Sequence, residues 1–307
     1  MRLSADQIAE FDENGFVILE DFLKDDELSR LLDAVNTVID KVRREKQLDS
    51  SAPIAIRNVL AHHDAFLDLI DHPRMLPLVV DAIGWNIQIR TTHLDYRPPY
   101  PQGVVGGEIG RSDGDDAKTG YNNLGWHPDL AGEHMFEAPS LDGRLPYMEI
   151  KVFYSLSDLS ESDRGNLWVV PGSHRRSPQE LRDPSYRVPA NEALELKTPP
   201  GTAVLWRTAT WHCVGPNYSD LIRKILHVGY HYRWLRPTDY VMQDHELLSR
   251  SSPIRRQLLG AMGTESHPLG SDPANQPVSQ YWLTENRDDV PLRAWAEHRL
   301  QQDQEPE

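Results

Sequence analysis

Two histidines and one aspartate of this chain are of the types that hold a redox metal. His127 and Asp129 stand two residues apart with Pro128 between them, and His212 lies far downstream. Two imidazoles and one carboxylate on one face of a metal leave the opposite positions open, and this ligand set suits non-heme Fe(II) sites that activate oxygen. We therefore predict an iron site formed by His127, Asp129 and His212.

A His-x-Asp step is a weak signal by itself, because an acidic chain with 13 histidines produces it by chance. The same pattern occurs at residues 62–64 and at residues 93–95. The first falls at the start of a predicted helix, where Asp64 is explained by the helix dipole. In the second, His93 and Asp95 share one face of a predicted strand, so the sequence leaves that pair open as metal ligands.

The surroundings favour the pair at His127 and Asp129. A segment rich in Gly and Asn precedes it, so the backbone can bring both side chains to the end of a strand. His212 follows a short predicted strand and precedes a Gly-Pro-Asn turn at residues 215–217. For any one of these histidines, a partly buried structural imidazole is a simpler explanation than metal binding. The prediction of a metal site therefore depends on His127, Asp129 and His212 taken together.

Arg223, eleven residues after His212, adds a second kind of chemistry. An iron site that splits dioxygen needs two further electrons, which 2-oxoglutarate supplies by oxidative decarboxylation after it chelates the metal. Its far carboxylate then requires an anchor, and a guanidinium offers a two-donor fork that lysine lacks. Alone, Arg223 would be explained as a surface residue; with the metal ligands it indicates an oxoacid site.

Together these residues resemble the phytanoyl-CoA dioxygenase family of Fe(II)- and 2-oxoglutarate-dependent oxygenases, from Gly15 to Trp234. The matching positions are Asp158, Gly165-Asn166-Leu167, Pro171-Gly172-Ser173-His174, His212, Asn217, Ser219 and Arg223. The resemblance implies a mainly β fold with flanking α-helices and a double-stranded β-helix core, jelly-roll or cupin-like, with iron at the barrel mouth. It implies Fe(II), 2-oxoglutarate and O2 as cofactors.

The chain departs from the family pattern in two places. Gly165 and Asn166 stand in reverse of the usual order, and Val214 replaces a small hydroxyl residue that often helps to hold the oxoacid. Another side chain must then complete the cosubstrate pocket, and Lys151 is a candidate. Residues 147–155 alternate, which puts Lys151 on the face opposite the apolar one. If that face lines the barrel, Lys151 binds the cosubstrate; if it faces water, Lys151 is only solvated.

The elements around these residues divide into helices followed by strands. A capping box at Ser4 and Gln7 predicts a first helix, an apolar stripe over residues 28–42 predicts a second, and residues 65–83 predict a third, interrupted near Pro77. Candidate strands are Ile87 to Tyr96, Tyr147 to Ser155, Leu167 to Val170, Thr202 to Trp206 and Lys224 to Trp234. His227 and His231 lie on the same face of the predicted strand as Arg223. They could contact the substrate or be structural histidines of the barrel.

We expect one domain over residues 1–307, with a helical part over about 1–84, a β-helix core over about 85–236 and a helical and loop extension over 237–307. A Gly- and Asp-rich segment at residues 103–120 is expected to form a mobile loop near the site. Ser252 and Pro253 are expected to begin a helix.

The composition limits the partners. A net charge of -15 and a pI near 5.3 oppose binding to phosphate backbones and anionic membranes. Cys213 is the only cysteine, no apolar run reaches the ~18 residues of a spanning helix, and acidic residues near the start argue against a secretory signal. We expect a small-molecule substrate, no nucleic acid or membrane partner and a cytoplasmic location; the oligomeric state stays open.

The predicted reaction is hydroxylation of an unactivated C–H bond in a small metabolite, with release of succinate and CO2. Desaturation, epoxidation or ring modification could use the same metal site. Asp129 favours these outcomes over halogenation, because related halogenases leave that ligand position free for halide. A zinc hydrolase would suit the same three ligands but would leave Arg223 without a role. A jelly-roll binding protein without a functional metal is the remaining alternative.

Overall fold

The structure is a computed structural model, and it describes residues 2–101, 125–129, 147–183, 186–261 and 290–302. The predicted loop at residues 103–120 lies outside these ranges.

The N-terminal helices follow the sequence pattern. Helix α1 (Ala5–Asn14) has the predicted capping box, with Ser4 and Gln7 each accepting the other's backbone N–H. Helix α2 (Asp25–Lys46) has three acidic residues in its first turn, where they complement the helix dipole, and buries an apolar stripe of Leu31, Ala34, Val35, Val38, Ile39 and Val42. Both helices confirm the prediction.

The third helical stretch breaks at a different place from the one predicted. It consists of η1 (Val59–Ala61), η2 (Asp64–Phe66), α3 (Leu67–Ile70) and α4 (Met75–Ile83). The interruption falls at residues 71–74, so the prediction near Pro77 was wrong. Pro77 is the third residue of α4, where a backbone N–H would have no intrahelical acceptor, and proline is therefore tolerated there.

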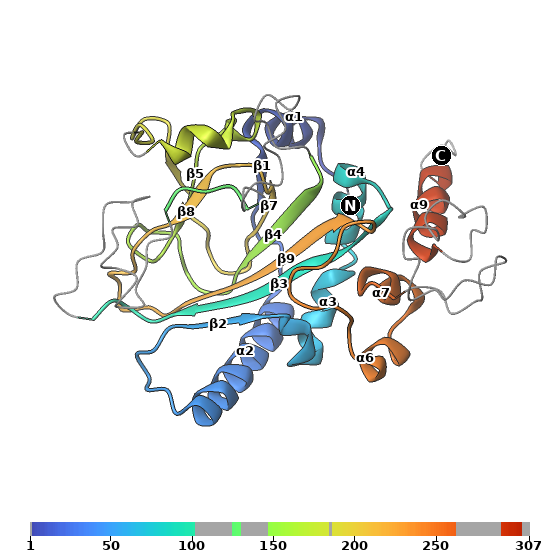
Figure 1. The fold of residues 1–307 in the computed structure, drawn as a ribbon, viewed down its shortest axis with the longest axis horizontal. Coiled ribbons are helices and arrows are strands. Elements are labelled where there is room, and N and C mark those ends of the chain that lie inside the picture. Colours follow the sequence, from blue (N-terminus) through green and yellow to red (C-terminus); the bar gives the residue numbers. More distant parts are fainter. Residues whose placement is uncertain (1, 102–124, 130–146, 184–185, 262–289, 303–307) are drawn as a thin grey trace.

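Two antiparallel sheets form the core (Figure 1). The larger has the order β1-β7-β4-β9-β3-β2, with β1 at Phe16–Leu19, β2 at Ile54–Arg57, β3 at Ile87–Arg97, β4 at Glu149–Ser155, β7 at Ala203–Arg207 and β9 at Arg223–Tyr232. The smaller has the order β6-β5-β8, with β5 at Leu167–Val169, β6 at Leu194–Glu195 and β8 at His212–Val214. The 3-10 turns η4 (Ser173–Arg175) and η5 (Pro178–Arg182) lie between β5 and β6.

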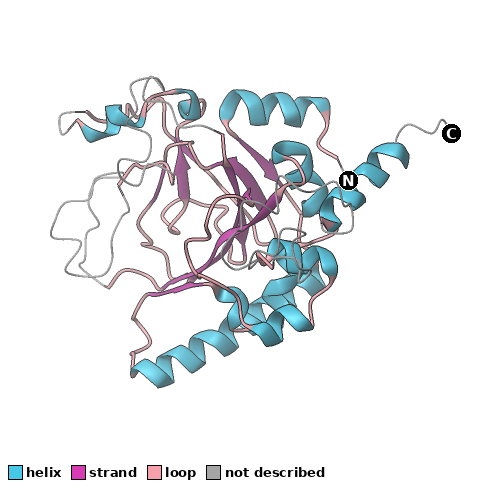
Figure 2. Cartoon of the chain, turned by 45° about the vertical axis from the view of Figure 1, so that its right-hand side comes forward, coloured by secondary structure: helices cyan, strands magenta, loops and turns pink. Residues whose placement is uncertain are grey.

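Each face of the larger sheet has its own apolar core. The outer face of β4, β7 and β9 packs with α2, α3 and α4 in one large apolar cluster. Figure 2 shows helices flanking the strands of the core. The inner face packs against the smaller sheet, where Phe153, Val204 and Ile225 meet Leu167 and Val169. This is the predicted mainly β fold with flanking helices and a double-stranded β-helix core.

The C-terminal helices are α6 (His245–Ser249), α7 (Pro253–Leu258) and α9 (Pro291–Gln302), and Ser252 caps α7 as predicted. Among them, α7 packs on the beginning of β3 and α9 packs on α7. The Gln257 amide donates to the carbonyls of Trp85 and Ile87 and accepts the backbone N–H of Leu292. Within the described ranges, none of the helices has the length and apolar character needed to cross a membrane.

Candidate metal and cosubstrate site

His127, Asp129 and His212 meet at one place in the structure. Their ligand atoms all lie within 4.8 Å of one another. Backbone pairing brings them together: His127 and His212 form an isolated antiparallel bridge, with N–H to carbonyl distances of 3.0 Å in both directions. The backbone N–H of Asp129 donates to the carbonyl of Thr208 at 2.9 Å. The backbone of residues 208–212, which leads into β8 at His212, therefore aligns the other two side chains.

Both imidazoles are oriented for a metal through Nε2. Nδ1 of His127 lies 2.6 Å from the carbonyl of Gly125, and Nδ1 of His212 lies 2.9 Å from the carbonyl of Thr210. A carbonyl can only accept, so each Nδ1 carries the proton and each Nε2 keeps its lone pair. Burial lowers the pKa of His212 to about 4, which keeps this imidazole neutral at pH 7.

Asp129 provides a carboxylate at the same point. Burial by itself would raise its pKa, but the positive charge of Lys151 beside it holds the pKa of Asp129 well below its usual range. Its Oδ2 is buried, pairs with Nζ of Lys151 at 2.8 Å and lies 3.6 Å from Nε2 of His212. A buried, ionised carboxylate beside two neutral imidazole nitrogens is a donor set that fits a bound divalent cation.

Lys151 lies in the barrel interior, on the face of β4 opposite the apolar outer one. Its Nζ is 2.8 Å from Oδ2 of Asp129, and its side chain is 9% exposed. The structure therefore brings Lys151 to the metal ligands rather than to water. Its predicted contact with the cosubstrate stays a prediction.

Arg223 begins β9 and is completely enclosed, with 0% of its side chain exposed. Nη1 donates to Oδ2 of Asp95, whereas Nε and Nη2 have no hydrogen-bond partner among the described residues. Desolvation lowers the pKa of Arg223 to about 10, so the group is still charged at pH 7. Nε and Nη2 form one edge of the guanidinium, and this two-donor edge fits a carboxylate.

Asp95 has a role that the sequence did not reveal. The structure places it against Arg97 and Arg223, with Arg97 Nε at 2.9 and 3.0 Å from its two oxygens. Burial would raise the pKa of Asp95, but the two guanidinium charges hold it well below its usual range. Among the described residues, the set of His127, Asp129 and His212 is the only group of three with metal-binding geometry, so residues 93–95 are not part of one.

An aromatic wall crosses the interior from the metal ligands toward β3. Trp206 is edge-on to His212 at 6.0 Å and to His227 at 5.8 Å. His227 is edge-on to Phe153 and stacks on His93, each with ring centroids 5.5 Å apart. His227 is thus packed between rings, which fits its reading as a barrel histidine.

Glu149 is a second interior carboxylate that sequence reasoning missed. It is 1% exposed, pairs with Arg90 through Oε2, and leaves Oε1 without a partner among the described residues. Burial raises the pKa of Glu149 to about 7. Alternation along the strand puts Glu149 on the same face as Lys151, and this pattern is the sequence signal that could have placed Glu149 in the interior.

Comparison with known proteins agrees with this architecture. The family model for phytanoyl-CoA dioxygenase (PhyH) matches residues 11–225, well over half of the chain. The chain belongs to this family. The match begins within α1 and ends two residues after Arg223, so it contains every proposed ligand.

Two curated relatives in the family have described activities. The ectoine dioxygenase of Bordetella parapertussis is 26% identical over 213 residues, which are 63% of this chain and 61% of the relative. A probable alpha-ketoglutarate-dependent hypophosphite dioxygenase of Stutzerimonas stutzeri is 23% identical over 252 residues, 74% of this chain and 78% of the relative. The match thus spans less than two thirds of the ectoine dioxygenase.

Solved structures share the fold. EctD from S. alaskensis, determined with 2-oxoglutarate and 5-hydroxyectoine, has a TM-score of 0.57 at 21% identity, over 77% of this chain and 78% of that one. The carbocyclase SnoK from nogalamycin biosynthesis has a TM-score of 0.55 at 19% identity, over 81% and 91%. The double-stranded β-helix predicted from the sequence is therefore confirmed.

Proposed function

We propose that this PhyH-family protein is an Fe(II)- and 2-oxoglutarate-dependent dioxygenase that hydroxylates an unactivated C–H bond of a small metabolite. The observation that carries the proposal is the pairing of two unfilled groups. One is the set of His127, Asp129 and His212 with its converging ligand atoms, and the other is the donor edge of Arg223, which has no partner among the described residues. Within one barrel, the first suits a cation and the second suits a carboxylate.

Each residue has a defined task in this proposal. His127 and His212 would bind the iron through Nε2, and Asp129 would bind it through its carboxylate. Arg223 would hold the far carboxylate of 2-oxoglutarate. When bound, iron would activate O2, which is the oxidant, with two electrons from the decarboxylation of 2-oxoglutarate to succinate and CO2, while the protein positions the substrate and excludes water. Phe153, Trp206 and His227 would contribute apolar ring surface to the interior beside the metal ligands.

The substrate is proposed only as a class. The relatives act on ectoine and on hypophosphite, which are both small molecules, and the match covers 61% of the ectoine dioxygenase. We propose a small metabolite for this chain, with no nucleic acid or membrane partner, because its charge of -15 repels both. We also propose a cytoplasmic location. Cys213 is the single cysteine and is buried, so the chain has no internal disulfide that would require an oxidising compartment.

Anaerobic reconstitution tests the proposed function. The protein is loaded with Fe(II) and 2-oxoglutarate without oxygen, and we expect a visible metal-to-ligand charge-transfer band. Admission of air should then release succinate, and both signals should require both additions. The control is Zn(II) in place of Fe(II), which gives neither signal. Absence of the band and of succinate, together with zinc-dependent hydrolysis of ester or amide substrates, would replace this proposal by the zinc hydrolase.

A further inference from the structure

We infer that Asp95 is a positioning residue that aims Arg223 at the cosubstrate and thereby selects the length of the oxoacid. The inference rests on the proposed function, since it concerns the same cosubstrate site. Asp95 lies on β3 and Arg223 lies on β9. Of the three nitrogens of the Arg223 guanidinium, only Nη1 donates a hydrogen bond to Asp95.

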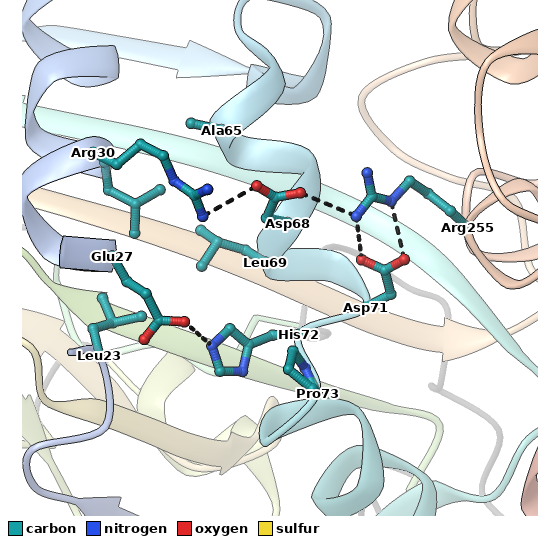
Figure 3. Close-up of a pocket in the computed structure, with 11 residues that line it drawn as sticks. Leu23, Glu27, Arg30, Ala65, Asp68, Leu69, Asp71, His72, Pro73 and Arg255 are labelled. Carbon is teal, nitrogen blue, oxygen red and sulfur yellow. Dashed lines mark hydrogen bonds and ion pairs between the residues drawn. The ribbon is translucent and has the colours of Figure 1, made fainter.

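A second arginine of this protein shows what a filled guanidinium edge looks like. Figure 3 shows a cavity of about 340 Å³ between α2, α3 and α7, on the helical side of the larger sheet. There, Nε and Nη2 of Arg255 hold the two oxygens of Asp71 at 3.0 and 2.6 Å, and Nη2 also reaches Asp68 at 3.2 Å. The edge that Asp71 fills on Arg255 is the one left open on Arg223.

Asp95 also fixes the direction in which that open edge points. The guanidinium is planar, so holding Nη1 sets the orientation of Nε and Nη2 as well. Asp95 cannot turn with Arg223, because Arg97 Nε contacts both of its oxygens. The buried fork is therefore presented at a fixed position relative to the strands that carry the metal ligands.

Asp95 is also the charge that holds Arg223 in place before the cosubstrate binds. Among the described residues, Asp95 is the only anionic partner of the Arg223 guanidinium. Without Asp95, Arg223 would have no anionic partner among these residues and could turn toward other acceptors.

A fixed fork implies selectivity for the length of the cosubstrate. The oxoacid must reach from the metal to Arg223, and an extra methylene group misplaces one end. We therefore expect the parent protein to prefer 2-oxoglutarate over 2-oxoadipate, and the preference to shrink when Asp95 no longer restrains Arg223.

The test measures affinities for both oxoacids in the Fe(II)-loaded protein without oxygen, by titration calorimetry. Asp95→Ala should weaken 2-oxoglutarate binding by about ten- to hundredfold, the range for losing a charged hydrogen bond. The weakening for 2-oxoadipate should be smaller, so the ratio of the two affinities falls. Asp95→Asn keeps an acceptor of equal size and should lose only part of the affinity, which keeps the test valid if Asp95→Ala does not fold.

Asp71→Ala is the matched control, because it breaks a partly buried aspartate-arginine pair outside the barrel. It should change thermal stability but leave both oxoacid affinities as in the parent. Unchanged affinities and an unchanged ratio in the Asp95 variants would overturn the inference, and so would an equal loss in Asp71→Ala. If the parent itself binds no 2-oxoglutarate, the proposed function fails instead, so the two failures are distinguishable.

Discussion

At the scale of single residues, the site depends on the charge that each side chain keeps once it is buried. His212 is neutral at pH 7, as a metal ligand must be, whereas Asp129 is ionised beside Lys151. Arg223 is enclosed and still charged because Asp95 faces it. Neutral nitrogens, one carboxylate and one buried cation are the groups that a ferrous ion and a dicarboxylate require.

The first prediction concerns Arg223. In Arg223→Ala, we expect 2-oxoglutarate affinity to fall at least about tenfold, since two charge-assisted hydrogen bonds are lost, with iron affinity unchanged. Arg223→Lys should recover only part of the loss, because an ammonium group lacks the planar fork. Calorimetry with Fe(II) and with 2-oxoglutarate measures the two affinities separately. Equal 2-oxoglutarate affinity in parent and Arg223→Ala would remove Arg223 from the site.

The second prediction concerns Lys151. Once a metal ion neutralises Asp129, the buried ammonium of Lys151 needs another anion, which the cosubstrate can provide. We therefore expect Lys151→Met to weaken 2-oxoglutarate binding by about tenfold while iron binds equally well or more tightly. The opposite pattern, with weaker iron binding and unchanged 2-oxoglutarate binding, would assign Lys151 to Asp129 alone. Circular dichroism checks that the variant is folded.

The sequence identified the residues that make the site but not all of their partners. His127, Asp129 and His212 were predicted from residue type and context, and the structure brings their ligand atoms together. The pairing of Asp95 with Arg223 was missed, because it depends on the register of β3 against β9. That register involves residues 128 positions apart, which local patterns do not encode.

At the scale of elements, strand alternation predicted the faces of β4 but not those of β3. The sequence left open whether the Lys151 face of β4 lines the barrel or faces water. In the structure Lys151 faces the barrel interior, and its neighbours Ile150 and Val152 face the helices. In β3, the register shifts between Ile89 and Thr91, which reverses the faces of all later residues. The shift turns Asp95 into the barrel, and a strictly alternating pattern could not show this.

The turn before β5 is tied to the position of Arg223, and this gives the third prediction. Gly165 has φ +76, and a Cβ there would lie 2.7 Å from Cδ of Arg223. Gly172 has nearly the same φ, +75, but its Cβ would meet only the carbonyl of Glu13, at 3.5 Å. We expect Gly165→Ala and Gly172→Ala to share a backbone strain of about 1–2 kcal/mol. Only Gly165→Ala should also weaken 2-oxoglutarate binding.

Urea unfolding measures the strain, and calorimetry measures the binding. The reversed Gly-Asn order noted in the sequence therefore places the glycine where Arg223 needs space. Equal 2-oxoglutarate affinities in the two glycine variants would show that Gly165 does not influence Arg223.

At the scale of the whole molecule, one large core supports the proposal that the chain is a single domain. The outer cluster contains residues from Phe11 in α1 to Ala296 in α9, so the segments before and after the barrel share its packing. Chain length and the absence of a linker led to the same expectation from the sequence. The order of the strands could not be predicted, because each sheet joins strands that are distant in the chain.

The fourth prediction concerns acid stability. Burial lowers the pKa of His93, His174 and His212 to about 4, that of His231 to about 3, and that of His227 well below its usual value. Between pH 6.5 and 4, each of these histidines is protonated only in the unfolded chain, so stability falls as the pH falls. Burial raises the pKa of Glu149 to about 7, so near pH 5 this carboxyl is protonated in the folded protein and ionised in the unfolded chain. Glu149 therefore releases about one proton on unfolding, which offsets the uptake by one histidine.

Unfolding near pH 5 should therefore take up about four protons per molecule. Urea unfolding of the metal-free protein at several pH values gives this number from the slope of the unfolding free energy against pH. A free energy that is constant or rises on acidification through this range would contradict the prediction.

The most direct test of the central claim is a crystal structure of the protein prepared without oxygen with Fe(II) and 2-oxoglutarate, with data collected at the iron absorption edge. We predict an anomalous peak between Nε2 of His127, Nε2 of His212 and the carboxylate of Asp129, with the far carboxylate of 2-oxoglutarate on Nε and Nη2 of Arg223. An iron peak elsewhere, or an oxoacid that does not reach Arg223, would contradict the account.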